Sequence, residues 1–306
     1  MMDTILNIME SGSRVATAIG FASLAGMISE RVGVVNMGLE GMMLFGSFFG
    51  VVGSFLTGNA WIGVLFALAA GALSGLLHAV LTVGFKCDHI LSSLGINMLA
   101  SGMTLVLIEV IWNSRGQSAM VNGIGTFKLP VISEIPVLRD IIGTISPFLV
   151  ILIVCMIIAQ YFIFHTVTGV RIRVIGDNPE VAGSLGINVY RIQYIALIIS
   201  GMLASMGGAY LSIGDINMFV KDMVSGRGYI ALAMVVLGRW HPIGVVSVGL
   251  IYGMAEGMQY RLQSMAMASQ LVQCIPYVAT LIVLLVARSG KGGPKASGKH
   301  YYMKGA

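Results

Sequence analysis

The residues best suited to bind another protein lie in a short polar segment near the middle of the chain. There the sequence reads Gly176-Asp177-Asn178-Pro179-Glu180-Val181-Ala182, and Gly186 follows. An Asp or Asn at this place can cap a helix, a proline suits the first turn, and an acidic side chain favours the positive end of the helix dipole. Gly186 would end the helix after about two turns. A short helix with such defined ends fits a groove of another protein, so we predict a docking element outside the bilayer.

A second polar segment, residues 29–41, places Asn36 and Glu40 among three glycines and between two apolar runs. Polar groups at membrane depth are costly unless they pair or line a wet cavity, and broken, Gly-rich backbone is tolerated only in such places. Asn97, within a later apolar run, presents the same choice. Each side chain is therefore predicted either to line a translocation path or gate, or to bond neighbouring helices together.

Residue combinations that would indicate an enzyme or a proton-driven carrier are missing from the sequence. It has no HExxH motif, no arrangement that argues for a nucleophile, and no ladder of acidic residues and histidines through its apolar runs. A lone His78 is expected to hydrogen-bond a neighbouring helix rather than to relay protons. Residues 293–300 resemble a phosphate-binding loop, but His300 stands where that loop needs Ser or Thr to hold magnesium. We predict no catalytic residue, cofactor or metal site here, and expect any ATP hydrolysis in another chain.

The composition indicates the surroundings that these residues need. Of the 306 residues, 57% are hydrophobic and 10% charged, and the mean hydropathy is +0.89. A soluble protein of this size exposes too much surface to hide so many apolar side chains, and a disordered chain needs the opposite composition. The 40 glycines and 21 methionines suit closely packed helices in lipid. The chain is therefore predicted to be an all-α, polytopic integral membrane protein.

Apolar runs long enough to cross a hydrocarbon core of about 30 Å as helices mark the predicted spans. They cover residues 12–28, 42–57, 60–84, 91–112, 145–164, 192–213, 243–259 and 270–287, and the shorter run 229–238 is predicted to be a half-helix or a short crossing. We expect about 8–10 transmembrane helices in a single domain over residues 1–290. Because Lys and Arg concentrate on the cytoplasmic side, residues 165–191 and the C-terminus should lie inside and the N-terminus outside.

The C-terminal tail carries the excess of positive charge. Five basic residues and no acidic ones lie between Arg288 and the last residue, and basic and acidic residues are equal in number over the rest of the chain. This pattern favours a flexible basic cytoplasmic tail over residues 291–306 that sets orientation, rather than a segment that binds nucleic acid. Cys87, Cys155 and Cys274 lack metal-ligand spacing and are expected to be small hydrophobic residues.

Three blocks, in order along nearly the whole chain, resemble the permease subunits of ABC importers, in the branch for branched-chain amino acids, simple sugars and nucleosides. The family patterns are G-x-x-N-x-G-x-E-G-x-M, G-E-N-P-x-A-A-x-x-x-G-I, and G-R-G-F-I-A-L-A followed by G-R-W-N-P-x-G. Residues 33–43, 176–187, 226–233 and 238–244 are similar to them. Asp177 stands where Glu is usual, and His241 where Asn is usual.

The resemblance implies a permease paired with a second permease subunit, identical or different, in the cell membrane. A cytoplasmic ABC ATPase, which binds ATP and Mg, would dock on each subunit, and an extracytoplasmic binding protein would supply the solute. Residues 176–189 would be the coupling helix. Its ATPase-docking residues would be Gly176, Asp177, Asn178, Pro179, Glu180, Ala182 and Gly186, and Asn36, Glu40 and Asn97 would lie along the translocation path.

The third block favours nucleosides as the solute, and neutral polar side chains suit an uncharged hydroxylated molecule. A permease for simple sugars or branched-chain amino acids is the alternative within the family. From other classes, an ion-coupled secondary carrier and a channel subunit without pumping are the competing hypotheses. The missing acidic ladder counts against the secondary carrier.

Overall fold

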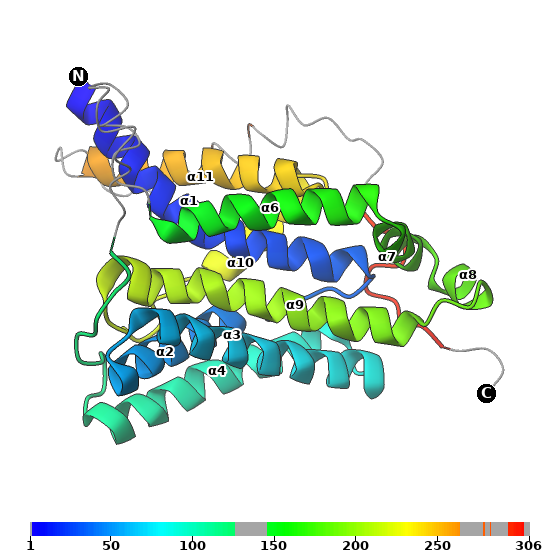
Figure 1. The fold of residues 1–306 in the computed structure, drawn as a ribbon, viewed down its shortest axis with the longest axis horizontal. Coiled ribbons are helices and arrows are strands. Elements are labelled where there is room, and N and C mark those ends of the chain that lie inside the picture. The colour runs from blue at the N-terminus through cyan, green and yellow to red at the C-terminus, as the bar shows by residue number, and fades with distance from the viewer. Residues whose placement is uncertain (1, 126–145, 264–277, 279–281, 283–292, 303–306) are drawn as a thin grey trace.

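The computed structural model describes residues 2–125, 146–263, 278, 282 and 293–302 (Figure 1). Its helices are α1 (Met2–Arg31), α2 (Leu39–Thr57), α3 (Ala60–Ala79), α4 (His89–Trp112), α6 (Pro147–His165), α7 (Val167–Asp177), α8 (Pro179–Ser184), α9 (Val189–Ala209), α10 (Arg227–Leu237) and α11 (Pro242–Gln263), with π-helical turns η1 (Val80–Gly84) and η2 (Tyr210–Ile216). In the described residues, extended chain pairs at Gln117 and Val220, and no strand forms. The predicted all-α membrane architecture is confirmed.

The helices match the predicted spans closely. Five stretches are long and apolar enough to cross a membrane, and each coincides with a predicted crossing: residues 39–57, 60–84, 89–112, 147–165 and 189–216. α1 and α11 cover the crossings predicted at 12–28 and 243–259. α10 has 11 residues, which is the length of a half-helix. The crossing predicted at 270–287 lies, apart from residues 278 and 282, outside the described residues.

Glycines bring the central helices into direct contact. A side chain at Gly71 of α3 would collide with Gly201 and Ser205 of α9, and one at Gly46 of α2 would collide with the Ser205 backbone. Lipid tails are as apolar as leucine, so helices in a membrane associate through close van der Waals packing, which small residues permit. α2, α3 and α9 therefore form a tight unit.

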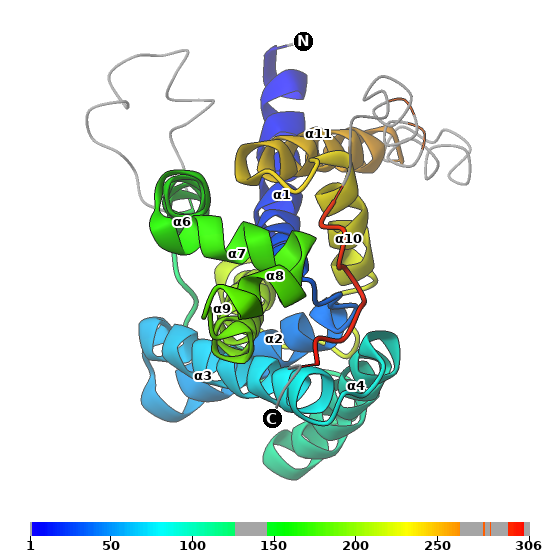
Figure 2. The ribbon, with the colours of Figure 1, turned by 90° about the vertical axis from the view of Figure 1, so that its right-hand side faces the viewer.

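Burial separates the central helices from the peripheral ones. In the most apolar window of α2 and of α9, 72% of the residues are buried inside the chain, against 22% for α4 and for α6. Seen along the helices, α4 and α6 lie on different sides of the bundle, with α9 and α2 between them (Figure 2). The outward faces of α4 and α6 are therefore left for lipid or for another subunit.

The two ends of the bundle carry different elements. α7, α8 and the described part of the tail lie at one end, which we call the α7–α8 end, and the N-terminus lies at the other (Figure 1). The N-terminus and the predicted docking segment are thus on opposite sides of the bundle, as the sequence predicts. Which side of the membrane each end faces still rests on the distribution of Lys and Arg.

The described part of the tail, residues 293–302, packs against the α7–α8 end, where the composition predicts a flexible segment. Ala296 donates its backbone N–H to the Gly176 carbonyl at 2.9 Å, and Gly298 donates to the Gly33 carbonyl at 3.0 Å. Ala296 and Tyr301 are only 6% and 7% exposed. The flexibility predicted for residues 291–306 stays a prediction; the described part of this segment is held by backbone hydrogen bonds and by the buried side chains of Ala296 and Tyr301.

Candidate functional site

α8 begins at the predicted cap. Asn178 has extended backbone, and its Oδ1 accepts a hydrogen bond from the Val181 N–H at 3.2 Å. The helix covers Pro179–Ser184, with the proline in its first turn, and Gly186 follows with a φ of +76°. It is shorter than the predicted 176–189 because Asn178 also ends the preceding helix. The cap is confirmed, and the bounds are corrected.

α7 is a helix that the sequence pattern does not predict. Thr166 caps it through its side-chain oxygen. Ile175 of α7 and Ala182 of α8 are fully buried in an apolar cluster that also holds Val32 and Val34, from the linker between α1 and α2. α7 and α8 are therefore packed onto that linker, so a displacement of α8 reaches the linker through direct contacts.

The predicted docking residues differ in exposure. Gly176 and Ala182 are buried and Pro179 is half-buried, whereas Asp177, Asn178, Glu180 and Gly186 are exposed. Two apolar residues that sequence reasoning missed, Val181 and Leu185, are 46% and 70% exposed. The sequence could have indicated both as contact residues, because apolar side chains on a helix too short to cross a membrane need another partner.

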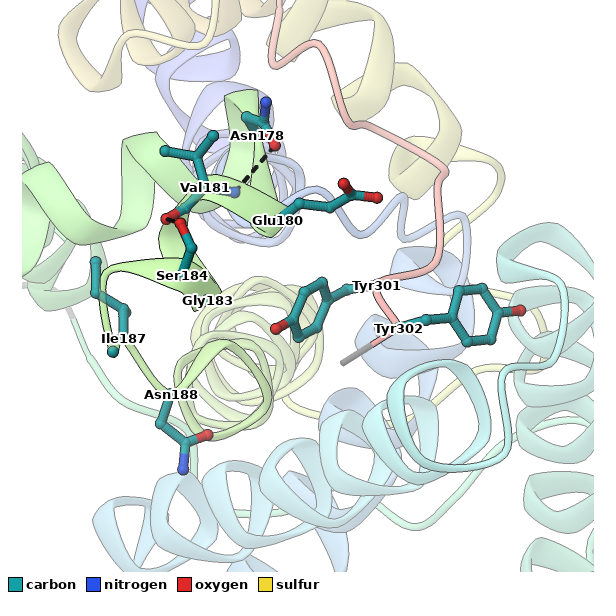
Figure 3. A pocket seen from close by; sticks show the side chains of 10 residues that line it. Asn178, Glu180, Val181, Gly183, Ser184, Ile187, Asn188, Tyr301 and Tyr302 are labelled. Carbon is teal, nitrogen blue, oxygen red and sulfur yellow. Dashed lines mark hydrogen bonds between the residues drawn. The ribbon is translucent and has the colours of Figure 1, made fainter. Parts of the chain in front are cut away.

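A hollow of about 730 Å³ opens beside α8 (Figure 3). It is lined by Asn178, Glu180, Val181, Gly183, Ser184, Gly186, Ile187, Asn188, Tyr301 and Tyr302. Figure 3 shows the Tyr301 ring directed toward α8 and the Tyr302 ring directed away from it. α8, the turn into α9 and the tail thus build one surface at the α7–α8 end.

The second candidate region lies inside the bundle, where the linker of residues 32–38 runs back from the α7–α8 end as non-helical chain before α2 begins (Figure 1). Backbone in such a place must find hydrogen-bond partners within the protein. Polar residues one helical turn apart on α4 accept backbone N–H groups of the linker and of the first turn of α2: His89 Nδ1 from Val35 at 3.3 Å, Ser93 Oγ from Met37 at 3.1 Å, and Asn97 Oδ1 from Gly41 at 2.8 Å. One face of α4 therefore holds the linker.

The Asn97 side chain joins three segments. Besides accepting from Gly41, its Nδ2 donates to the Met37 carbonyl at 3.1 Å and to the Tyr229 hydroxyl of α10 at 2.9 Å. Tyr229 is 46% exposed and Asn97 is half-buried, so this pair is reachable from outside the subunit. Sequence reasoning missed Tyr229, because only the folded chain brings α10 beside α4.

Glu40, in the first turn of α2, caps the N-terminus of α10. Its carboxylate oxygens accept the backbone N–H groups of Gly226 at 2.7 Å and Gly228 at 2.8 Å. A side chain at Gly228 would collide with the Glu40 backbone, so a glycine is required at this approach. The N-terminal ends of α2 and α10 therefore meet at the Glu40 carboxylate, and a carboxylate suits the positive dipole end of α10.

Asn36 is fully enclosed in this conformation. Its Oδ1 accepts the Gly38 N–H at 3.0 Å, and its Nδ2 donates to Ser200 Oγ of α9 at 3.3 Å. Ser200 in turn donates to the Ala25 carbonyl of α1 at 2.8 Å. The structure thus brings Asn36, Glu40 and Asn97 to one region around the start of α2, where Asn36 is buried and Glu40 and Asn97 are half-buried.

Two other polar residues of the spans have clear roles. His78 bonds Ser92 across α3 and α4, with 3.0 Å between Nδ1 and Oγ, as a helix-to-helix contact. The Glu256 side chain of α11 is 11% exposed, and its carboxylate lies 3.5 Å from the Arg227 guanidinium. α10 therefore carries a basic residue against α11, which hydropathy alone does not reveal.

The third sequence block forms a corner between α10 and α11 that contacts the end of α1. Arg31 Nε donates to the Trp240 carbonyl at 2.9 Å, and Glu30 accepts the indole N–H of the same tryptophan. Trp240 holds a φ of +53°, a conformation that a non-glycine residue adopts only when its surroundings impose it. His241 packs on Phe164 with 4.5 Å between ring centroids, and burial lowers the pKa of its imidazole.

Potential metal ligands do not gather in the part of the chain that the structure describes. No group of three or more His, Cys, Asp or Glu side chains is placed there to hold an ion. The predicted lack of cofactor and metal sites stays a prediction.

The sequence matches the family model described as "Branched-chain amino acid transport system / permease component" over residues 8–285. The chain belongs to this family. The permease is 36% identical over 299 residues to the nucleoside ABC transporter permease protein NupC of Lactococcus lactis subsp. cremoris, with 94% of this chain and 93% of the relative covered. It is 34% identical over 297 residues to the guanosine ABC transporter permease protein NupQ of Bacillus subtilis, with 94% and 93% covered.

A solved structure shares the fold of this permease. It is an inward-facing conformation of an ABC transporter described as of the metal-chelate type, with a TM-score of 0.51 and 15% identity, covering 90% of this chain and 85% of that one. At this identity the likeness concerns the fold alone. The permease component of an ABC transporter, the family of this chain, is a multi-pass membrane subunit and is not itself catalytic.

Proposed function

We propose that this chain is the membrane-spanning subunit of an ABC importer that carries nucleosides across the cell membrane, powered by a separate ATPase. The observation that supports this most strongly is the 36% identity, over nearly the full length of both chains, to a relative named as a nucleoside permease. The relative named for guanosine adds to it. The alternatives of a secondary carrier and a channel subunit lack a comparable observation.

The ATPase docks at the α7–α8 end, which faces the cytoplasm in this proposal together with the C-terminus. Arg171, Arg173 and Arg191 near this end favour the cytoplasmic side. ATP and Mg bind to the ATPase, a second permease subunit completes the transporter, and a binding protein delivers solute at the opposite end. The exposed capped start of α8, at Asp177, Asn178 and Glu180, is the surface that the ATPase contacts.

The solute passes the Asn97–Tyr229 pair. An amide and a phenol offer both donors and acceptors without a charge, which suits the hydroxyl and base groups of an uncharged nucleoside. The pair is reachable from outside the subunit, at a face that a second subunit would cover. Asn36, which is fully enclosed, and Glu40, which caps α10, keep α2 and α10 in place behind this pair.

Uptake by reconstituted vesicles tests this proposal. The complete complex, with its ATPase and binding protein, is expected to accumulate labelled guanosine or uridine only when ATP is present on the ATPase side. Excess unlabelled nucleoside should compete, and excess glucose or leucine should not. Uptake that persists without the ATPase, or that an uncoupler abolishes at constant ATP, would contradict the proposal.

A further inference from the structure

The described part of the tail, residues 293–302, runs across the α7–α8 end. Its backbone bonds first to Gly176 at the end of α7, then to Gly33 in the linker, and finally the Tyr301 carbonyl accepts from the Tyr190 hydroxyl of α9 at 3.3 Å. Tyr301 shares the apolar cluster of Ala182, the buried residue of α8. The tail is therefore tied to the elements that surround the docking helix, and its red trace runs across this end of the bundle in Figure 2.

The two tyrosines at the end of the described tail, Tyr301 and Tyr302, have different surroundings. Tyr301 is 7% exposed, packs on Tyr190 with 5.3 Å between ring centroids, and leaves no room for a side chain at Gly183 of α8. Tyr302 is 64% exposed, and the Lys86 ammonium lies 5.8 Å from the centroid of its ring. Both line the hollow beside α8 (Figure 3).

We propose that the tail completes the ATPase-docking surface: Tyr302 contacts the ATPase, and Tyr301 is a positioning residue that holds α8 at its place. The inference rests on the proposed function, because it names further contact residues for the same partner. Protein interfaces are enriched in tyrosine, whose rigid ring buries a large area at low entropic cost. Tyr302 and the exposed apolar Val181 of α8 line the same hollow, and an exposed tyrosine near an exposed apolar side chain has the composition of an interface.

The charge of the hollow favours a protein over a lipid surface. Among the described residues that line it, Glu180 carries the one formal charge, so the hollow is mildly acidic. Anionic headgroups bind at clusters of Lys and Arg, and the residues that line the hollow include neither. A groove with an apolar floor and a basic edge fits the surface, and we assign that groove to the ATPase.

Binding of the purified ATPase to the purified permease in nanodiscs tests the role of Tyr302. Tyr302→Ala is expected to weaken the affinity about tenfold, the effect of truncating an aromatic residue central to an interface, while Tyr302→Phe keeps the ring and stays within about twofold of wild type. Tyr161→Ala is the matched control, since Tyr161 is also 64% exposed but lies on α6. Wild-type affinity in Tyr302→Ala would overturn the assignment and leave lipid as the neighbour of this ring.

A pair of substitutions tests the role of Tyr301. A Cβ at position 183 would collide with the Tyr301 hydroxyl, so Gly183→Ala should push the ring or α8 aside and weaken ATPase binding severalfold. Adding Tyr301→Phe removes the colliding oxygen and should restore part of the affinity, because the next ring atom would still be close, at 3.1 Å. A double variant that binds no better than Gly183→Ala would refute the positioning role.

The same measurements separate the two proposals. If the ATPase binds neither wild type nor any variant, the proposed function fails and this inference fails with it. If Asn178→Ala weakens binding while Tyr302→Ala and Gly183→Ala do not, docking on α8 stands and only the contribution of the tail is wrong.

Discussion

Removing the carboxylate of Glu40 should destabilise the permease, because two backbone N–H groups at the start of α10 would lose their acceptor. The hydrogen bonds are 2.7 and 2.8 Å long. Hydrogen bonds to charged groups contribute about 1.5–3 kcal/mol each in water-soluble proteins and somewhat less in membrane proteins, so we take about 1.5 kcal/mol for each. Glu40→Ala should then lower the free energy of unfolding by about 3 kcal/mol, and Glu40→Gln, which retains one acceptor, by about half of that.

Unfolding of the purified permease by increasing SDS in mixed micelles, followed by tryptophan fluorescence, measures this difference. Glu109→Ala is the matched control: its side chain is 52% exposed, and its partner Arg115 is 89% exposed. An exposed ion pair contributes only about 0–1 kcal/mol. If Glu40→Ala unfolds as readily as Glu109→Ala while uptake is lost, Glu40 acts on the solute rather than on α10, and the reasoning is refuted.

Three further substitutions test other contacts. Gly201→Ala should disrupt the packing of α3 on α9 and lower the free energy of unfolding in the same SDS assay, whereas Gly95→Ala, with no atom within 4 Å of the added carbon, should not; equal effects would contradict the close approach. Asn97→Leu should lower the free energy of unfolding by about 2–3 kcal/mol, because linker backbone would lose its partners. A decrease below about 0.5 kcal/mol would show that another group takes the place of Asn97. Asn178→Ala should remove about 1 kcal/mol from the α8 cap and weaken ATPase binding in nanodiscs, and unchanged binding would show that the cap is not needed for docking.

Features that depend on neighbouring residues were predictable from the sequence. The cap at Asn178 needs only a side chain and the backbone three residues on, so its residue types reveal it. The crossings follow equally from local composition, since a run of apolar residues has few alternatives to a spanning helix. The run 229–238 was predicted to be a half-helix or a short crossing, and the 11 residues of α10 have the length of a half-helix.

Features that depend on distant contacts were not predictable. Asn36, Glu40 and Asn97 could be singled out as polar groups in apolar surroundings, but composition does not reveal that Tyr229, 132 residues from Asn97, lies beside it. The tail shows the same limit, because its lysines indicate solvent while Tyr301 packs into a cluster formed by α3, α7, α8 and α9. Charge and hydropathy describe a segment's average surroundings, and burial of single residues is decided by the partners that the fold supplies.

The hydrogen bonds of the linker also set an order for membrane insertion. The Met37 N–H bonds a residue 56 positions later, and the Val32 carbonyl accepts a hydrogen bond from Gln193 of α9, 161 positions later. During synthesis α1 and α2 leave the ribosome long before α4 and α9, so the backbone between them must keep water or the insertion machinery as its partner until those helices arrive. The non-helical linker between the first two helices therefore obtains its last hydrogen-bond partners only after most of the chain has been synthesised.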